Sequence, residues 1–341
     1  MSNFSDIIGH EAIIANLRKA VLNNRLSHAY ILDGAAGMGK NMIAGALAKT
    51  VQCENKVNLK YPDDRPDNRP DNCPDACGTC VSCRAFESGN HPDIIYVTTT
   101  KKSIGVDEIR EQVTHAMLTR PYKYKYKIFI IDNADTMTTQ AQNALLKTIE
   151  EPAEYGLFLL LSENLSVFLP TVLSRCVSFR LRPLPSELVK SYLVENGTDR
   201  ELAGFYTAFS QGNIGRAAKL ASSESFYAMR DTVVSLAQAI RRLDMPETFS
   251  RFSVLEPYKD NIQELLDLFL LWYRDVILYK ETSAARLIIQ TDKADEIYAE
   301  AQATPMGSLY NKFDAIWQAK RNLKSNANFQ LTLEMMLLEL R

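Results

Sequence analysis

The 341-residue sequence predicts an α/β domain with a parallel sheet, followed by helical domains. Two observations carry this prediction. In the first half of the chain, short β-prone apolar runs alternate with amphipathic segments, an order typical of a parallel sheet with helices on both faces. From about Leu181 the strand pattern stops, and short helical segments broken by glycine give way, from about Ser250, to longer amphipathic helices.

The elements of the first half follow in order. The predicted strands are short apolar runs bounded by turn residues: 27–34, 93–98, 127–132 and 157–164. The predicted helices have apolar residues at helical spacing: 11–25, 42–53, 106–118 and 140–152. Pro152 ends the last of them. Between these elements, residues 58–76 contain two tandem copies of RPDN and are too rich in Pro and Asp for a helix or a strand core, which predicts an exposed insertion.

Composition and charge exclude several functional classes. The chain is 46% hydrophobic and 23% charged with a net charge of −2, which gives no sign of general binding to nucleic acid or to an anionic membrane. The N-terminus lacks the basic and apolar regions of a signal peptide. The apolar run 265–278 is too short and too charged to span a bilayer. We expect this run to be a buried helix face, a candidate surface for partner chains, and the protein to be cytoplasmic.

The stretch GAAGMGKN follows the first predicted strand and opens the next helix, as in a phosphate-binding loop. Gly34, Gly37 and Gly39 allow a tight turn that aims backbone N–H groups at an anion. Lys40 would reach the β- and γ-phosphates, but Asn41 stands where a Ser or Thr hydroxyl normally binds Mg²⁺. The alternative is a glycine-rich turn with no ligand.

The second half of such a site is an apolar strand that ends in Asp, usually followed by Glu. Here the run is IIDNAD, so Asp132 is in place but Asn133 occupies the Glu position and cannot accept a proton. Two defects at the two elements that the chemistry needs predict a lost or very weak hydrolase. The alternative is an active enzyme that tolerates both residues.

Five of the six cysteines lie within residues 53–83, with the CxxCxxC spacing of a metal site. Cys77, Cys80 and Cys83 can converge on a tetrahedral zinc ion, and a closed site needs a fourth ligand. Cys53, at the end of a predicted helix, is the preferred fourth ligand; the alternatives are Cys73 and His91. A closed four-ligand site predicts a structural zinc.

Two arginines and one basic run remain as candidate binding residues. Arg175 in TVLSRC follows a predicted turn and can reach a neighbouring chain's phosphates, or it can be an ordinary surface residue. Arg216 in GNIGRAA lies early in a helix and can face this chain's own nucleotide or solvent. The run PYKYKYK (121–127) alternates Tyr with Lys, which fits either a nucleic-acid stacking surface or a solvated entry to a strand.

Taken together, these motifs resemble the clamp-loader branch of the AAA+ family. The matching segments cover most of residues 4–183: FSDIIGHEAI, SHAYILDGAAGMGK, the CxxCxxC excursion followed by SGNHPD, VDEIR, IIDNADTMTTQAQNALLKTIEEP and LPTVLSRC. GNIGRA is similar to the family's second-sensor motif. Beyond about residue 220 the likeness is only general helical character.

The resemblance implies an AAA+ P-loop core at 1–180 with a zinc module at about 53–92, a small helical lid at 181–245 and an all-α collar at 246–341. It implies a hetero-pentameric ring with gamma/tau and delta subunits that loads a sliding clamp onto primed DNA. Within the ring, Arg175 would be the arginine finger that acts in trans on a neighbour's ATP. Cys53 would be the family's first zinc ligand.

The departures at Asn41 and Asn133 fit a subunit of this branch that does not hydrolyse ATP. The resemblance leaves open whether ATP and Mg²⁺ bind to Gly34, Gly37, Gly39, Lys40, Asn41, Asp132 and Arg216 at all. Two alternatives remain: an active ATPase of the gamma/tau type, and a zinc-dependent DNA-binding module built on CGTCVSC and PYKYKYK. The near-neutral charge counts against the second.

Overall fold

The computed structural model describes residues 3–59 and 73–341. Contacts divide the chain into an N-terminal unit, formed by 1–188 with 213–216, and a C-terminal unit, formed by 189–212 with 217–341. Each unit encloses its own set of buried apolar side chains.

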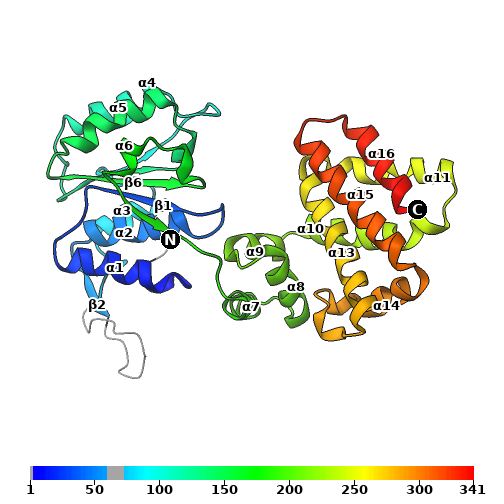
Figure 1. The fold of residues 1–341 in the computed structure, drawn as a ribbon. Helices are drawn as coiled ribbons and strands as arrows, with labels where there is room; N and C mark the ends of the chain where they lie inside the picture. Colours follow the sequence, from blue (N-terminus) through cyan, green and yellow to red (C-terminus); the bar gives the residue numbers. More distant parts are fainter. Residues whose placement is uncertain (1–2, 60–72) are drawn as a thin grey trace. The chain divides into compact units, whose positions relative to one another are not determined.

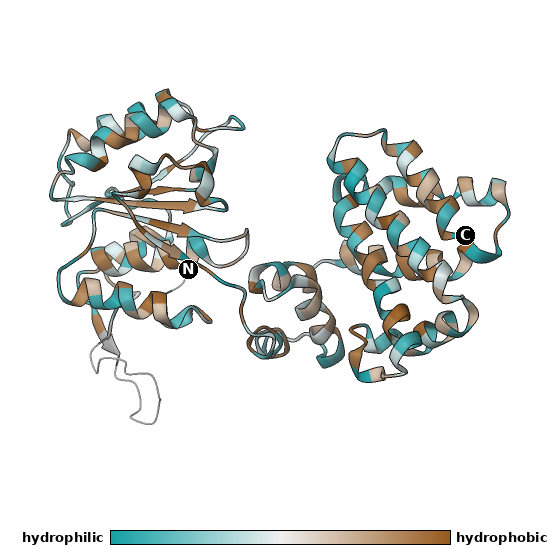
Figure 2. Cartoon of the chain, in the orientation of Figure 1, coloured by the Kyte–Doolittle hydropathy of each residue, from teal (hydrophilic) through white to brown (hydrophobic). Residues whose placement is uncertain are grey.

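The N-terminal unit is built around a five-stranded sheet in the order β4-β5-β6-β1-β7, and each neighbouring pair is parallel (Figure 1). The strands are β1 (Ala29–Asp33), β4 (Ile94–Val97), β5 (Lys127–Ile131), β6 (Gly156–Ser162) and β7 (Val177–Arg180). Every residue of β1, β5 and β6 is buried. Figure 2 shows these strands as largely hydrophobic. The predicted parallel α/β sheet is confirmed.

Alternate residues of each strand enter one of two hydrophobic cores on opposite faces of the sheet. On β5, Ile128 and Ile130 join one core, and Phe129 and Ile131 join the other. The first core is covered by α1 (Glu11–Leu22), α2 (Lys40–Gln52) and α3 (Val81–Glu87). The second is covered by α4 (Val106–Ile109), α5 (Thr139–Glu150) and α6 (Pro170–Leu173). The strands are therefore continuous apolar runs because both of their faces are covered.

The predicted helix at 106–118 forms, but its middle is wound differently. After α4, Arg110–His115 is a π-helix. Ile109, Val113 and Met117 are all buried in one core although they are spaced four residues apart. In a regular α-helix each such step advances about 40° beyond a full turn, so the wider π turn keeps the three side chains on the same face.

The prediction of an exposed insertion at 58–76 is wrong at its ends. Val57–Leu59 (β2) and Cys73–Asp75 (β3) pair as an antiparallel two-stranded sheet. Asp75 and Ala76 are buried. The carboxylate of Asp75 is tolerated there because it accepts several hydrogen bonds and pairs with Arg18. Both RPDN copies lie outside the described residues.

The C-terminal unit is helical and is centred on α13 (Ile262–Thr282), which packs against α10, α14 and α15. Its helices are α8 (Arg200–Ser210), α10 (Glu224–Ala239), α11 (Met245–Ser250), α12 (Phe252–Leu255), α14 (Ala294–Ala303), α15 (Met306–Lys324) and α16 (Phe329–Leu340). Two further helices, α7 (Ser186–Glu195) and α9 (Ile214–Ala221), begin in the N-terminal unit and end in the C-terminal unit.

The predicted buried face at 265–278 is confirmed, and its use as a surface for partner chains stays a prediction. Leu268, Trp272, Tyr273 and Val276 are buried inside this unit, where α13 meets its neighbouring helices. In the described part of the chain, no helix is both long and apolar enough to cross a membrane.

Candidate functional site

The predicted phosphate loop connects β1 to α2 at the carboxyl edge of the sheet. Gly37 (φ +84°) and Gly39 (φ +89°) adopt left-handed conformations that favour glycine. Lys40 is the first residue of α2 and is buried. Its ammonium group donates to the carbonyl of Gly34 and lies 3.7 Å from the carboxylate of Glu163. The loop has the shape of an anion site, but its lysine is engaged within the chain.

Asn41 and Asp132, which stand at the two motif positions that normally hold Mg²⁺, contact each other. The Asn41 amide donates to Asp132 Oδ2 over 3.1 Å, and Asp132 Oδ1 accepts the backbone N–H of Asn133 over 2.9 Å. Asn133 has φ +48° and starts a short 3₁₀ turn, a left-handed conformation that Asn tolerates better than Glu does. Sequence reasoning identified the two substitutions but not the hydrogen bond between Asn41 and Asp132.

The start of α9 lies directly on the phosphate loop, and these residues belong to the N-terminal unit. The Asn213 amide donates to the carbonyl of Ala36 over 2.6 Å, and Gly215 N–H donates to the carbonyl of Gly37 over 3.1 Å. A Cβ at position 215 would lie 2.4 Å from the Gly37 carbonyl oxygen, so this approach requires glycine. The Arg216 N–H donates to Asn213 Oδ1, which places Arg216 next to the loop.

His10 makes a further contact with the phosphate loop. His10 has φ +57°, and its Nε2 donates to the carbonyl of Met38 over 3.2 Å. Burial lowers the pKa of His10, partly offset by its hydrogen bond to Met38. The loop carbonyls of residues 34, 36, 37 and 38 therefore all accept hydrogen bonds from this chain. Asn213, Gly215 and His10 were missed from the sequence because their contacts join distant segments.

The four cysteines Cys53, Cys77, Cys80 and Cys83 form a cluster in which all sulfur atoms lie within 4.8 Å of one another. Cys53 ends α2 and Cys80 begins α3, and their sulfur atoms are 3.9 Å apart. Tetrahedral zinc with Zn–S bonds of 2.3 Å would separate its sulfur ligands by about 3.8 Å. The cluster could therefore hold a metal ion. The side chain of the alternative ligand, Cys73, lies outside the described residues.

Backbone N–H groups point at these sulfur atoms. Cys77 N–H donates to Cys53 Sγ, Cys80 N–H to Cys77 Sγ, and Cys83 N–H to Cys80 Sγ, over 3.3 to 3.4 Å. Burial alone would raise the pKa of the Cys77 thiol, but hydrogen bonds from Thr79 and Cys80 lower it to about 6. Burial raises the pKa of Cys53 and Cys83. A bound cation would favour the thiolate at all four positions.

His91 is not a further ligand of this cluster. Its Nδ1 accepts the Asp93 N–H over 3.2 Å, and its Nε2 lies 3.1 Å from the hydroxyl of Ser82. Both ring nitrogens are therefore used inside the fold. The sequence alternative that named His91 as the fourth ligand is wrong, because the ring supports α3 rather than the sulfur atoms.

Arg175 lies between α6 and β7, at the amino edge of the sheet. Its guanidinium group donates to the carbonyl of Thr171 over 3.0 Å and pairs with Glu150 over 2.9 Å. The Arg175 side chain remains 38% exposed. Glu150 ends α5 and holds the arginine from one side, a role that the sequence did not reveal. Because the strands are parallel, Arg175 and Asp132 lie at opposite edges of the sheet, about 16 Å apart along a five-residue strand.

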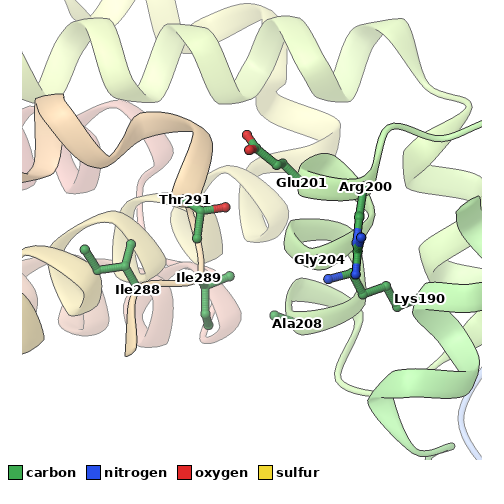
Figure 3. Close-up of a pocket in the computed structure, with 8 residues that line it drawn as sticks. All are labelled: Lys190, Arg200, Glu201, Gly204, Ala208, Ile288, Ile289 and Thr291. Atoms are coloured by element: carbon green, nitrogen blue, oxygen red, sulfur yellow. The ribbon is translucent and has the colours of Figure 1, made fainter. Parts of the chain in front are cut away.

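A pocket of about 490 Å³ lies in the C-terminal unit (Figure 3). Lys190, Arg200 and Gly204 line one side, and Ile289 and Thr291 line the other. None of the predicted site residues contributes to it. Glu201 also lines the pocket.

Comparisons with known proteins agree with these motifs. A family model described as "DNA polymerase III, delta subunit" matches residues 9–185, and one described as "DNA polymerase III, delta subunit, C terminal" matches residues 234–341. DNA polymerase III subunit delta' of Bacillus subtilis is 30% identical over 328 residues, covering 95% of this chain and 94% of its own. Subunit tau of the same organism is 25% identical, covering 94% of this chain and 58% of its own.

Among solved structures, a gamma subunit-related protein of DNA polymerase III from Thermotoga maritima aligns with 96% of this chain and 98% of its own. The sequence identity is 18% and the TM-score is 0.47. The first family model covers just over half of the chain, and the similarity to the Bacillus subtilis delta' subunit extends along nearly all of it. The chain therefore belongs to the delta-prime subunits of bacterial DNA polymerase III, in the clamp-loader branch that its motifs resemble.

Proposed function

We propose that this chain is the subunit of a DNA polymerase III clamp loader that does not hydrolyse ATP. It sits in a hetero-pentameric ring with gamma/tau and delta subunits and supplies Arg175 in trans to a neighbour's ATP. The ring loads a sliding clamp onto primed DNA, and this chain meets DNA only within the assembly. Its core is 1–180, its lid 181–245 and its collar 246–341, in the cytoplasm.

The hydrogen bond between Asn41 and Asp132 carries the first half of the proposal. A working site needs a hydroxyl and a carboxylate that both face Mg²⁺, and a Glu that polarises the attacking water. Here the amide and the carboxylate face each other at 3.1 Å, and Asn133 cannot act as a base. Gly34, Gly37, Gly39, Lys40, Asn41, Asp132 and Arg216 are then the remnant of a nucleotide site.

Arg175 supports the second half. An arginine finger must be exposed at a subunit surface and oriented well enough to reach a phosphate. The contacts of Arg175 with Thr171 and Glu150 orient the side chain and leave part of the guanidinium group in solvent. A carboxylate partner can be exchanged for a phosphate when a neighbour docks, because both accept the same planar pair of donors.

We propose further that Cys53, Cys77, Cys80 and Cys83 hold one structural zinc ion. Four thiolates leave no open coordination position, so the metal supplies folding energy to its module and no chemistry. Within this chain, the cysteines fix the end of α2 against α3.

The test is ATP turnover, stimulated by DNA and clamp, in a reconstituted ring. We expect Arg175→Ala to slow turnover on the order of 10³-fold at the site that it serves, as the loss of an arginine finger does. Lys40→Ala should leave turnover nearly unchanged. The similarity to tau raises the opposite possibility, an active ATPase. A loss of turnover with Lys40→Ala, and none with Arg175→Ala, would establish that activity and overturn the proposal.

A further inference from the structure

The pocket in the C-terminal unit is not used by the proposed function. Its volume of about 490 Å³ lies within the usual range for pockets that bind small molecules. Residues of α7 and α8 line one wall, and residues 288–291 line the other (Figure 3). All of these residues belong to the same unit.

Two cations on the first wall have no partner within the chain. In the part of the chain that the structure describes, the side chains of Lys190 and Arg200 form no ion pair and no hydrogen bond, and Glu201 pairs with neither. Arg200 lies one helical turn before Gly204 on α8, and Lys190 Nζ would lie 3.8 Å from a Cβ at position 204. This wall therefore presents positive charge that the fold does not neutralise.

Gly204 keeps this wall open. It lies inside α8, where glycine is among the least favourable residues. Among the described residues, an added Cβ would meet only Lys190 Nζ, and 3.8 Å is an ordinary contact distance. Packing within the chain therefore does not require glycine here. Alanine would place a methyl group against the ammonium group, whereas glycine leaves that space to a ligand.

The opposite wall is fixed by the buried carboxylate of Asp275, which lies on α13. Its Oδ2 accepts the backbone N–H of Ile289 over 3.1 Å and that of Gln290 over 2.9 Å. These bonds fasten to α13 the segment that supplies Ile288, Ile289 and Thr291 to the pocket.

The buried Arg230 connects the two walls. Its Nε donates to Gln290 Oε1 over 3.1 Å, and its two terminal nitrogen atoms donate to Asp292 over 2.7 and 2.8 Å. Its guanidinium carbon lies 4.0 Å from the ring centroid of Phe205, the residue after Gly204 on α8. The pocket is therefore preformed, and a preformed site loses little entropy when it binds a ligand.

We infer that this pocket binds a small organic anion: a carboxylate or a phosphate monoester with a short apolar chain and a hydroxyl group. Lys190 and Arg200 bind the anionic group, because ammonium and guanidinium groups make charge-assisted hydrogen bonds to both kinds of oxyanion. Ile288 and Ile289 contact the apolar chain on the opposite wall.

The remaining lining residues narrow the class of ligand. In Figure 3 the oxygen atoms of Glu201 and Thr291 lie apart from the nitrogen atoms of the two cations. There they can accept a hydrogen bond from the hydroxyl group of the ligand. The lining contains no aromatic ring, which disfavours a nucleobase. The inference does not depend on Arg175 or on the phosphate loop.

The experiment is calorimetric titration of the purified chain with two probes, hydroxyisocaproate and hydroxybutyl phosphate, which distinguish a carboxylate from a phosphate ligand. We expect the parent to bind one of them. Lys190→Gln and Arg200→Gln should each weaken that binding about 10-fold, as the loss of a hydrogen bond to a charged group does. Lys324→Gln removes an exposed lysine of α15 in the same unit and should bind like the parent.

Gly204→Ala separates a role in binding from a role in folding. Alanine favours the helix, so we expect the C-terminal unit to melt about 2–4 °C higher. The methyl group beside Lys190 should nevertheless weaken binding of the probe. A variant that gains stability and binds the probe like the parent would show that no ligand approaches Lys190, and would overturn the inference.

Other outcomes also decide against it. A parent chain that binds neither probe at millimolar concentration overturns the inference, and so does binding that Lys190→Gln and Arg200→Gln leave unchanged. Acetate and inorganic phosphate that bind as tightly as the probes would exclude an organic ligand. An acidic peptide that binds the parent but not these variants, while neither probe binds, would favour a protein partner instead. ATP turnover of the ring tests the proposed function separately.

Discussion

The two edges of the sheet in the N-terminal unit differ in how far their phosphate-motif cations are buried. At the carboxyl edge, Lys40, Asn41 and Asp132 are hydrogen-bonded within the chain, and four carbonyls of the phosphate loop accept bonds from its own residues. At the amino edge, Arg175 is oriented by Glu150 but partly open to solvent. Both edges carry residues that the sequence motifs predict to bind phosphate. Of the two cations among them, Arg175 keeps part of its side chain in solvent, whereas Lys40 is buried.

The difference shows that a motif residue is informative only together with its hydrogen-bond partners. Lys40 and Arg175 are both cations predicted to bind phosphate. Lys40 is buried beside the Gly34 carbonyl, and a ligand would have to compete with that contact. Arg175 would exchange one exposed carboxylate for a phosphate, which is a smaller change.

The largest expected effect tests whether Arg175 acts on ATP turnover through its planar guanidinium group or only through its charge. We expect Arg175→Lys in the reconstituted ring to slow ATP turnover on the order of 10²-fold or more, because lysine lacks the planar pair of donors. Arg180→Lys, an exposed arginine at the far end of β7, is the control and should behave like the parent. Turnover that Arg175→Lys leaves intact would mean that charge alone suffices and would weaken the contrast between the edges.

Metal removal tests whether the structure at the carboxyl edge of the sheet depends on the cysteine cluster. The two are connected by α2, which begins at Lys40 in the phosphate loop and is capped by Cys53. We expect one zinc per chain, and we expect a chelator to unfold the module around α3 while the C-terminal unit keeps its thermal transition. Metal analysis measures the zinc content, and hydrogen exchange of residues 81–87 measures the unfolding of the module. Cys83→Ser should lose the metal, whereas Cys176→Ser, outside the cluster, should keep it. Unchanged exchange after chelation would contradict the zinc assignment.

Gly215→Ala tests the backbone contact that closes the phosphate loop. The new Cβ would lie 2.4 Å from the Gly37 carbonyl oxygen, so we expect the free energy of unfolding of the N-terminal unit to fall by about 1–3 kcal/mol. Gly307→Ala is the matched control, since nothing lies within 4 Å of its added Cβ. Gly307 lies in α15, so Gly307→Ala should raise the free energy of unfolding by at most about 1 kcal/mol. Urea denaturation of both variants gives the comparison, and equal stability would mean that α9 does not rest on the loop in solution.

The smallest expected effect is a pH dependence of the stability of the N-terminal unit, through His10 beside the phosphate loop. Burial lowers the pKa of His10 below its ordinary value of 6.5. As the pH falls below 6.5, the unfolded chain takes up a proton that the folded chain resists, so stability should fall with decreasing pH. His10→Asn, which tolerates the left-handed conformation, should flatten this dependence between pH 7 and 5 in urea denaturation. A slope identical to the parent's would exclude His10 as its source.

Much of the core was predictable because local pattern and burial agree. The runs 127–132 and 157–164 are apolar at nearly every position, and the sheet buries both of their faces. The glycines at 37 and 39 are needed for local backbone geometry, so the loop could also be recognised. The division into domains at 180 and 245, and the roles of Arg175 and Arg216, stay predictions.

What could not be predicted involves contacts between distant segments. The sequence does not reveal that Asn213 reaches the carbonyl of Ala36, or that Asp93 binds the backbone of residues 122–124. The π-helix at Arg110–His115 was missed because its four-residue spacing also fits an α-helix. The ends of the insertion were missed because the buried ion pair of Asp75 with Arg18 offsets its poor strand propensity.

The contact between Gly37 and Gly215 also bears on the history of the chain. At both positions an added Cβ would collide with this chain's own atoms: Asn213 Oδ1 at 2.7 Å for Gly37, and the Gly37 carbonyl oxygen at 2.4 Å for Gly215. No ligand is needed to explain either glycine. Selection for a stable fold can therefore preserve the glycines of a phosphate loop after selection for hydrolysis has ended. A protein can in this way keep the signature of an ATPase through many generations in which it turns over no ATP.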